Sequence, residues 1–145
     1  MRSILLLACL AAAALGCSGS PVDLDPNSER ELGFLEYHGT PVEITVPATA
    51  KAGVPFTVRV ATWGGGCTAK GDTEVSVSGS TANVRPYDIT ATGRAAVCTD
   101  ILRTLMHETT VRFDTPGTAT VRVHGRVEPG SRTVVLTRTV TVQAN

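Results

Sequence analysis

The strongest constraint on the fold of this chain is a two-residue alternation of β-branched and polar side chains. Val58 and Val60 share one face of such a segment, as do Val121 and Val123 in another. Residues 17–145 contain 21 threonines and 18 valines, whose stiff side chains suit a pleated sheet. No segment after the N-terminal apolar run combines a helical period with a cap and a stop signal. The alternation therefore predicts an all-β domain.

Turn signals divide this domain about every 8–12 residues, and such spacing is typical of an immunoglobulin-like antiparallel β-sandwich of about seven strands. We assign residues 29–145 to that domain. Arg138 falls on the expected core face of the last strand, which requires a β-bulge, an edge position or a snorkelling side chain. The expected strands lie within Glu31–Tyr37, Val42–Val46, Phe56–Trp63, Val75–Val77, Val84–Ile89, Ile101–Phe113, Ala119–Val123 and Val134–Val142.

The segment Phe113–Val123 contains a Pro-Gly pair followed by alternating residues. It resembles the corner before the penultimate strand of bacterial Ig-like and PKD-like modules. Those modules commonly carry tyrosine where this chain has Ala119, so the resemblance supports a sandwich without assigning a particular family.

The N-terminus has the features of an export signal. Arg2 precedes an apolar run from Ile4 to Leu15, which is too short to span a bilayer and has the length of a signal-peptide core. Its end, Ala14-Leu15-Gly16-Cys17, resembles the lipobox of bacterial lipoproteins, although leucine is more usual than alanine at the first position. The resemblance implies that residues 1–16 are removed and that Cys17 carries the lipid. An ordinary secretory signal is the alternative.

A lipid on Cys17 would anchor the chain to a bilayer, because several acyl chains together give stable attachment. Ser18, rather than aspartate, follows the cysteine, and in lipoproteins of two-membrane bacteria this favours the outer membrane. Residues 17–28 are rich in Ser, Pro and Asp and are expected to be a flexible tether.

Four cysteines occur in the chain. Loss of Cys9 with the signal and lipidation of Cys17 leave Cys67 and Cys98, which we expect to form a disulfide in an oxidising compartment. If the strands run up and down, both cysteines lie in loops at the same end of the domain. Metal binding by these thiols is less favoured, and so is redox chemistry, for which there is no Cys-x-x-Cys motif.

The balance of charge excludes several classes of function. The chain has thirteen basic and thirteen acidic residues, and aromatic residues make up 4% of it. A nucleic-acid-binding surface or a polybasic membrane patch requires an excess of positive charge, and a stacking platform requires more rings. The sequence therefore predicts no nucleic-acid partner.

The loops that carry the two cysteines are the expected contact surface, since loops at one end of a sandwich commonly bind ligands. The glycines of this surface predict a mobile loop rather than a phosphate-binding one, because no Gly-Lys-Ser/Thr follows them. Arg126 and two histidines, His38 and His124, are expected at the same end. The candidate binding residues are Trp63, Gly64, Gly65, Gly66, Lys70, Arg94 and Asp100.

A copper site is the main alternative, because sandwiches can bind copper through histidine, cysteine and methionine. Its candidate ligands are His38, Met106, His107 and His124. We expect His124 to face solvent and His107 to be partly buried. The short loop that supplies Cys, His and Met in cupredoxins contains none of them here, so no metal or other cofactor is predicted.

Catalysis is not predicted either, since the chain has no Gly-x-Ser-x-Gly elbow and no obvious carboxylate pair. These features together predict an exported, lipid-anchored and non-catalytic protein of the cell envelope. Its domain is expected to be a binding or structural module whose partner is an envelope or extracellular protein. A periplasmic copper or metal carrier and a surface-presented enzyme inhibitor remain alternatives.

Overall fold

The computed structural model describes residues 27–93 and 97–145, and these form strands without any helix. The all-β prediction is confirmed. The predicted signal peptide, Cys17, most of the predicted tether and Arg94 lie outside the described residues. The strands are β1 (Ser28–Leu32), β2 (Phe34–Tyr37), β3 (Thr40–Pro41), β4 (Ile44–Thr45), β5 (Thr49–Lys51), β6 (Phe56–Gly64), β7 (Thr68–Ser78), β8 (Thr81–Ala91), β9 (Arg103–Val111), β10 (Gly117–Glu128) and β11 (Arg132–Gln143).

The described residues contain eleven strands rather than about seven, mainly because the N-terminal part of the domain is broken into short pieces. The expected first strand is divided at Gly33 into β1 and β2, and residues 40–51 form the short strands β3, β4 and β5. In addition, β7 is much longer than the predicted Val75–Val77. The prediction was too short because the first half of β7 carries polar side chains and shows no hydrophobic alternation.

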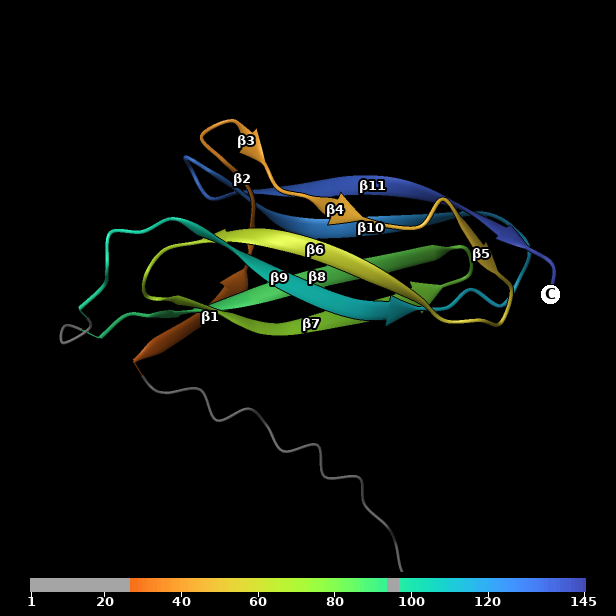
Figure 1. The fold of residues 1–145 in the computed structure, drawn as a ribbon, viewed down its shortest axis with the longest axis horizontal. Coiled ribbons are helices and arrows are strands. Elements are labelled where there is room, and N and C mark those ends of the chain that lie inside the picture. Colours follow the sequence, from red (N-terminus) through yellow and green to blue (C-terminus); the bar gives the residue numbers. More distant parts are fainter. Residues whose placement is uncertain (1–26, 94–96) are drawn as a thin grey trace, which may run out of the picture.

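The strands form one curled sheet (Figure 1). The hairpins β7–β8 and β10–β11 are antiparallel, and so is the pair β6–β9. One edge of β10 pairs with β8 and then, further along, with β2, and β2 in turn pairs with β6. Because β7 also packs against β9, the sheet curls round on itself and encloses the core.

Some of the pairing differs from the antiparallel arrangement that we expected. Thr120–Val123 of β10 run parallel to Thr81–Val84 of β8, and β10–β2 and β11–β5 are also parallel. The alternation in sequence specifies which face of a strand is buried, but it does not specify which strand becomes the neighbour.

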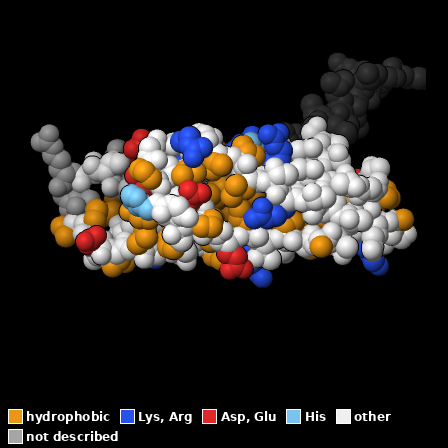
Figure 2. Space-filling model, turned by 90° about the horizontal axis from the view of Figure 1, so that it is seen from above, with side chains coloured by type: hydrophobic (Ala, Val, Ile, Leu, Met, Phe, Trp, Pro, Cys, Tyr) orange, Lys and Arg blue, Asp and Glu red, His pale blue; other side chains and the backbone are white. Residues whose placement is uncertain are grey.

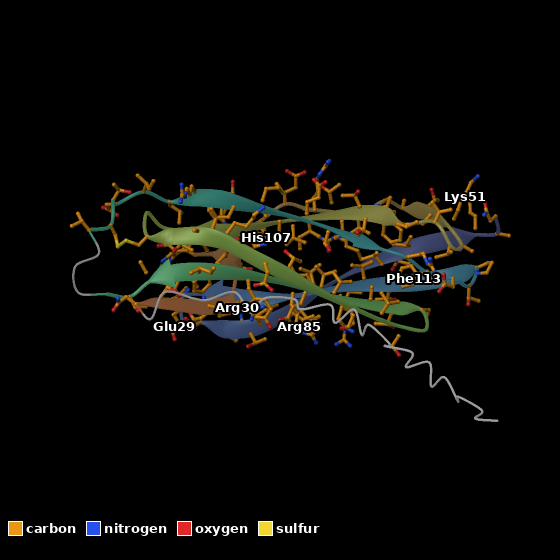
Figure 3. All side chains as sticks on the ribbon, turned by 90° about the horizontal axis from the view of Figure 1, so that it is seen from below. Glu29, Arg30, Lys51, Arg85, His107 and Phe113 are labelled. Carbon is orange, nitrogen blue, oxygen red and sulfur yellow. A yellow bond between two sulfur atoms is a disulfide. The ribbon has the colours of Figure 1, made fainter. Side chains whose placement is uncertain are left out.

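The core is aliphatic and lies inside the curl. Leu35 and several valines are fully buried there, and Phe113 is buried nearer one end of the molecule than His107, which lies near the middle (Figure 3). Arg138 is exposed, opposite the buried Val121 in an unbroken β10–β11 register. Arg138 lies in the part of β11 that pairs with β10 alone, so its side chain reaches solvent without a β-bulge. The main core residues are Leu35, Val58, Val60, Val84, Val111, Phe113, Val121, Val123, Val140 and Val142.

Gly33 lies between β1 and β2, where the chain stops pairing with β8 and begins to pair with β10. Its N–H donates to the carbonyl of Pro86 (2.9 Å), and its carbonyl accepts from the N–H of Arg126 (2.9 Å). A Cβ at this position would clash with the side chain of Thr62 and would lie 2.7 Å from Asp88 Oδ2. Only glycine therefore permits this change of strand partner without displacing the buried side chains around it.

The described part of the chain contains no helix that is long and apolar enough to cross a membrane.

Candidate binding cavity at the disulfide end

Cys67 and Cys98 form a disulfide, as the sequence predicted, with Cα atoms 5.0 Å apart. The bond joins the loop between β6 and β7 to the loop between β8 and β9, which lie at one end of the molecule. We call this the disulfide end, formed by residues 65–67 and the described part of 92–102. Gly66 lies directly against Thr99, so the two loops are in close contact beside the bond.

A small cavity of about 90 Å³ opens beside these loops. Trp63 lies in its wall, where its Nε1–H donates to the carbonyl of Thr40 (3.0 Å). The Tyr37 ring lies 6.5 Å from the Trp63 ring, centroid to centroid, so β2 and β6 together provide an aromatic side to the cavity. The lining residues are Phe34, Tyr37, Trp63, Gly64, Gly65, Thr68, Asp88, Thr90, Leu102 and Arg126.

Arg126 forms another part of the wall, and its charge is already matched. Its Nη1 pairs with Glu31 Oε2 at 2.7 Å, and its Nε–H donates to the carbonyl of Leu32 at 2.6 Å. The guanidinium also lies over the Phe34 ring, 4.2 Å from the centroid. These contacts hold Arg126 in place and reduce its attraction for an anion in the cavity.

Asp88 extends from β8 into a buried polar cluster. Its Oδ1 lies 3.0 Å from His107 Nε2, and both side chains are almost completely buried. The other ring nitrogen, Nδ1, lies 3.0 Å from Thr73 Oγ1. The Nε2–H tautomer satisfies both contacts, because it donates to Asp88 and accepts from Thr73. His107, labelled in Figure 3, thus connects β9 to both β7 and β8.

One oxygen of this cluster has no hydrogen-bond partner among the described groups. This oxygen, Asp88 Oδ2, is buried. An unpaired buried acceptor is costly, and a buried carboxylate oxygen is especially so. Asp88 also lines the cavity, but this unpaired oxygen is shielded beside Gly33 and is not exposed to the cavity.

The candidate binding residues divide into two groups in the structure. Trp63, Gly64 and Gly65 line the cavity. Gly66 packs against the other loop, whereas Lys70 and Asp100 are exposed and take no part in the cavity wall.

The candidate metal ligands do not form one site. Met106 and His107 are adjacent on β9 and differ completely in exposure, at 47% and 1%. His107 is thus more buried than predicted. His124 is on the outer side of β10, where its Nε2 lies 2.9 Å from Asn83 Oδ1, and His38 is exposed in the β2–β3 turn. No group of three or more His, Cys, Asp or Glu side chains in the described ranges could hold a metal ion.

Sequence reasoning did not identify Asp88, the most unusual residue of the cavity. Its position continues the inward-facing series Ala82, Val84 and Pro86 on β8, all of which are buried. A carboxylate at the next position of such a series is a recognisable signal, because charged groups on a core face are rare. The hydrophobic residues Tyr87 and Ile89 lie on the opposite face of β8, so an interpretation based on hydrophobic residues alone misses Asp88.

Large hydrophobic side chains are exposed beside the cavity. Val97, Ile101 and Leu102 remain 95%, 50% and 48% exposed in the loop that ends at β9. Figure 2, which views another side of the molecule, also shows hydrophobic side chains gathered toward the end that carries β2 and β3. A concentration of exposed apolar groups next to a cavity is typical of a binding surface.

Four described groups outside the cavity have shifted pKa values: the pKa is raised for Arg30 and Arg59 and lowered for Asp72 and His124. On the outer face of β7, Arg30 donates to Asp72 at 2.7 Å, and this hydrogen bond lowers the pKa of Asp72. Burial lowers the pKa of His124, and the nearby Arg85 and Arg122 act in the same direction. None of these four groups is part of the cavity wall.

Neither a protein-family model, nor a curated protein, nor a solved structure matches this chain. The geometry of the disulfide end is therefore the main guide to function.

Proposed function

We propose that this protein is a lipid-anchored, non-catalytic binding module of the cell envelope, and that its disulfide end is the contact surface. The observation that carries the proposal is the aromatic-lined cavity between Trp63 and Asp88, with exposed Ile101 and Leu102 beside it. Ligand sites are commonly concave, largely apolar and equipped with a few polar groups, and this cavity has each of these properties.

The cysteine disulfide supports an exported location for the domain, because such bonds persist mainly in oxidising compartments. Attachment to the membrane rests on the lipobox resemblance at Cys17, and the outer membrane of a two-membrane bacterium is favoured by Ser18 after it. We also propose that the domain is related to Ig-like sandwiches. The curled sheet of β6–β11 supports this, as does the Pro116-Gly117 corner before β10, although the parallel β8–β10 pair is a departure.

Substitution of the lipid site tests the anchor. Cys17→Ser should move the protein from the membrane fraction to the soluble envelope fraction, and incorporation of labelled fatty acid should stop. Retention of the label in the variant would contradict the proposal.

Site-specific crosslinking in intact cells tests the contact surface. A photo-crosslinker at Ile101, at the disulfide end, should give one discrete adduct. The same group at Val54 is a matched control, since Val54 is also exposed (42%) but lies in the turn before β6, at the opposite end. Equal labelling at both positions, or none at Ile101, would contradict a binding surface at the disulfide end.

A further inference from the structure

We propose that the disulfide end contacts the surface of a lipid bilayer, and that apolar side chains of the β8–β9 loop insert into that surface. This inference rests on the proposed function and names the partner of the same contact surface. Three side chains carry it, Val97, Ile101 and Leu102, which are 95%, 50% and 48% exposed. We call these three residues the apolar tip.

The apolar tip is fastened to the domain on both sides. Val97 directly precedes Cys98, whose disulfide with Cys67 joins the loop to the loop between β6 and β7. On the other side of the tip, the Nη2 of Arg103 donates to the carbonyl of Thr68 at 2.9 Å. The exposure of the tip is therefore a property of the fold. Exposed apolar groups that a domain holds in place without covering them are typical of a contact surface.

The N-terminal segment leaves the domain beside the tip, and this favours a bilayer as the partner. The N–H of Thr92 donates to the carbonyl of Asn27 at 2.7 Å, and the N–H of Ala91 donates to the carbonyl of Cys67 at 3.0 Å. In Figure 1 the start of β1 and the β8–β9 loop lie at the same end of the molecule. With the lipid on Cys17, residues 18–26 alone separate the anchor from this end.

A small apolar tip is sufficient because the anchor keeps it close to the lipid. Attachment through a short segment makes insertion an intramolecular step, for which the effective concentration reaches the mM range. Interfacial apolar side chains enter a bilayer by about 5–10 Å, to the boundary between headgroups and acyl chains. Each aliphatic side chain of the tip that enters this boundary is removed from water, which is favourable in proportion to the area buried.

The side chains around the tip suit the same boundary. Lys70 follows the β6–β7 loop and Arg103 follows the β8–β9 loop, and both are exposed, so their cationic groups can reach lipid phosphates. Trp63 and Tyr37 line the cavity behind the tip, and these two residue types favour the interface between lipid and water. Asp100 is the one charged residue among 97–102, and its carboxylate limits insertion to the headgroup level.

Quenching in vesicles tests the contact. The full-length lipidated protein, with a dansyl-bearing amino acid at Ile101, is bound to vesicles of phosphatidylethanolamine and phosphatidylglycerol. Phospholipids brominated on their acyl chains should quench this probe at least about threefold more strongly than the same probe at Val54, because only the first enters the boundary. Val54 is a matched control, since it is 42% exposed and lies at the opposite end. Equal quenching at the two positions would overturn the inference.

Matched substitutions test whether the apolar side chains cause the insertion. Leu102→Asp should lower the quenching at Ile101 by at least about half, because a carboxylate is costly to place in lipid. Val77→Asp makes the same change at a side chain of similar exposure, 45%, at the end of β7 far from Cys67, and should have no effect. If Leu102→Asp fails to fold by circular dichroism, the comparison of Ile101 with Val54 decides. Unchanged quenching in a folded Leu102→Asp variant would also refute the inference.

Crosslinking in intact cells separates a lipid from a protein partner. The discrete adduct expected from a photo-crosslinker at Ile101 should be a phospholipid, identified by its mass. A protein adduct at Ile101 would overturn the inference and leave the binding surface of the proposed function intact. Failure of the lipid anchor would be seen separately, as retention of Cys17→Ser in the membrane fraction.

Discussion

Removal of the Cys67–Cys98 disulfide should destabilise the domain by an amount that the loop length sets. The two cysteines are 31 residues apart in sequence. In the chain-entropy description, closing a loop of this size removes enough freedom from the unfolded chain to contribute about 3.5–4 kcal/mol at 25 °C. For a domain of this size, such a loss lowers the melting temperature by about 15 °C.

The double variant Cys67→Ser/Cys98→Ser, compared in a Cys17→Ser background, measures this contribution. Guanidinium unfolding followed by Trp63 emission gives the free energy, and either single substitution should cost as much as both together, because each breaks the same bond. A reducing agent should lower the stability of the parent but not of the double variant. A loss below about 1 kcal/mol would refute the reasoning, since it would mean that the unfolded chain gains little freedom.

Three further outcomes are expected. Gly33→Ala should destabilise the domain by about 1–3 kcal/mol in urea unfolding, because the added Cβ would clash with Thr62 and approach Asp88. Gly65→Ala is the control and should have little effect, because the nearest atom to its added Cβ would be 3.8 Å away. The free energy of unfolding should fall as the pH drops below about 6.5, because burial lowers the pKa of His124 in the folded chain and the unfolded chain then binds the proton more readily. His124→Gln should flatten that decline. An unchanged pH profile in the variant would exclude this histidine as its source. Elemental analysis of protein purified without a tag should find no stoichiometric copper, and bound copper that is lost in His124→Ala would instead favour the metal-carrier alternative.

The sequence specified strand positions well where one face is apolar and the other polar. β6, β10 and β11 follow their predicted valine series, and the disulfide could be predicted because alternate strands return the chain to the same end. The first half of β7 could not be predicted, since Lys70–Glu74 carry polar groups on both faces. The change of strand partner at Gly33 could not be predicted either, because it depends on how closely Thr62 and Asp88 approach from other strands.

The cavity was predictable only in part, for a similar reason. Trp63 and its glycines were recognisable as a loop at the end of a strand, and they do line the cavity. Phe34 and Arg126 reach the same place because β2 pairs with β6 at one position and with β10 at its other edge. That arrangement is a property of strand order, which hydrophobic alternation does not encode.

The position of β1 also determines how far the cavity can be from a membrane. Ser28 lies beside Ala91 at the disulfide end, and the eleven peptide units from Cys17 to Ser28 can span at most about 40 Å. With Cys17 held in a bilayer as proposed, the start of β1 stays within that distance of the lipid surface. The disulfide end would therefore meet partners at or close to the membrane rather than deep in the surrounding solution.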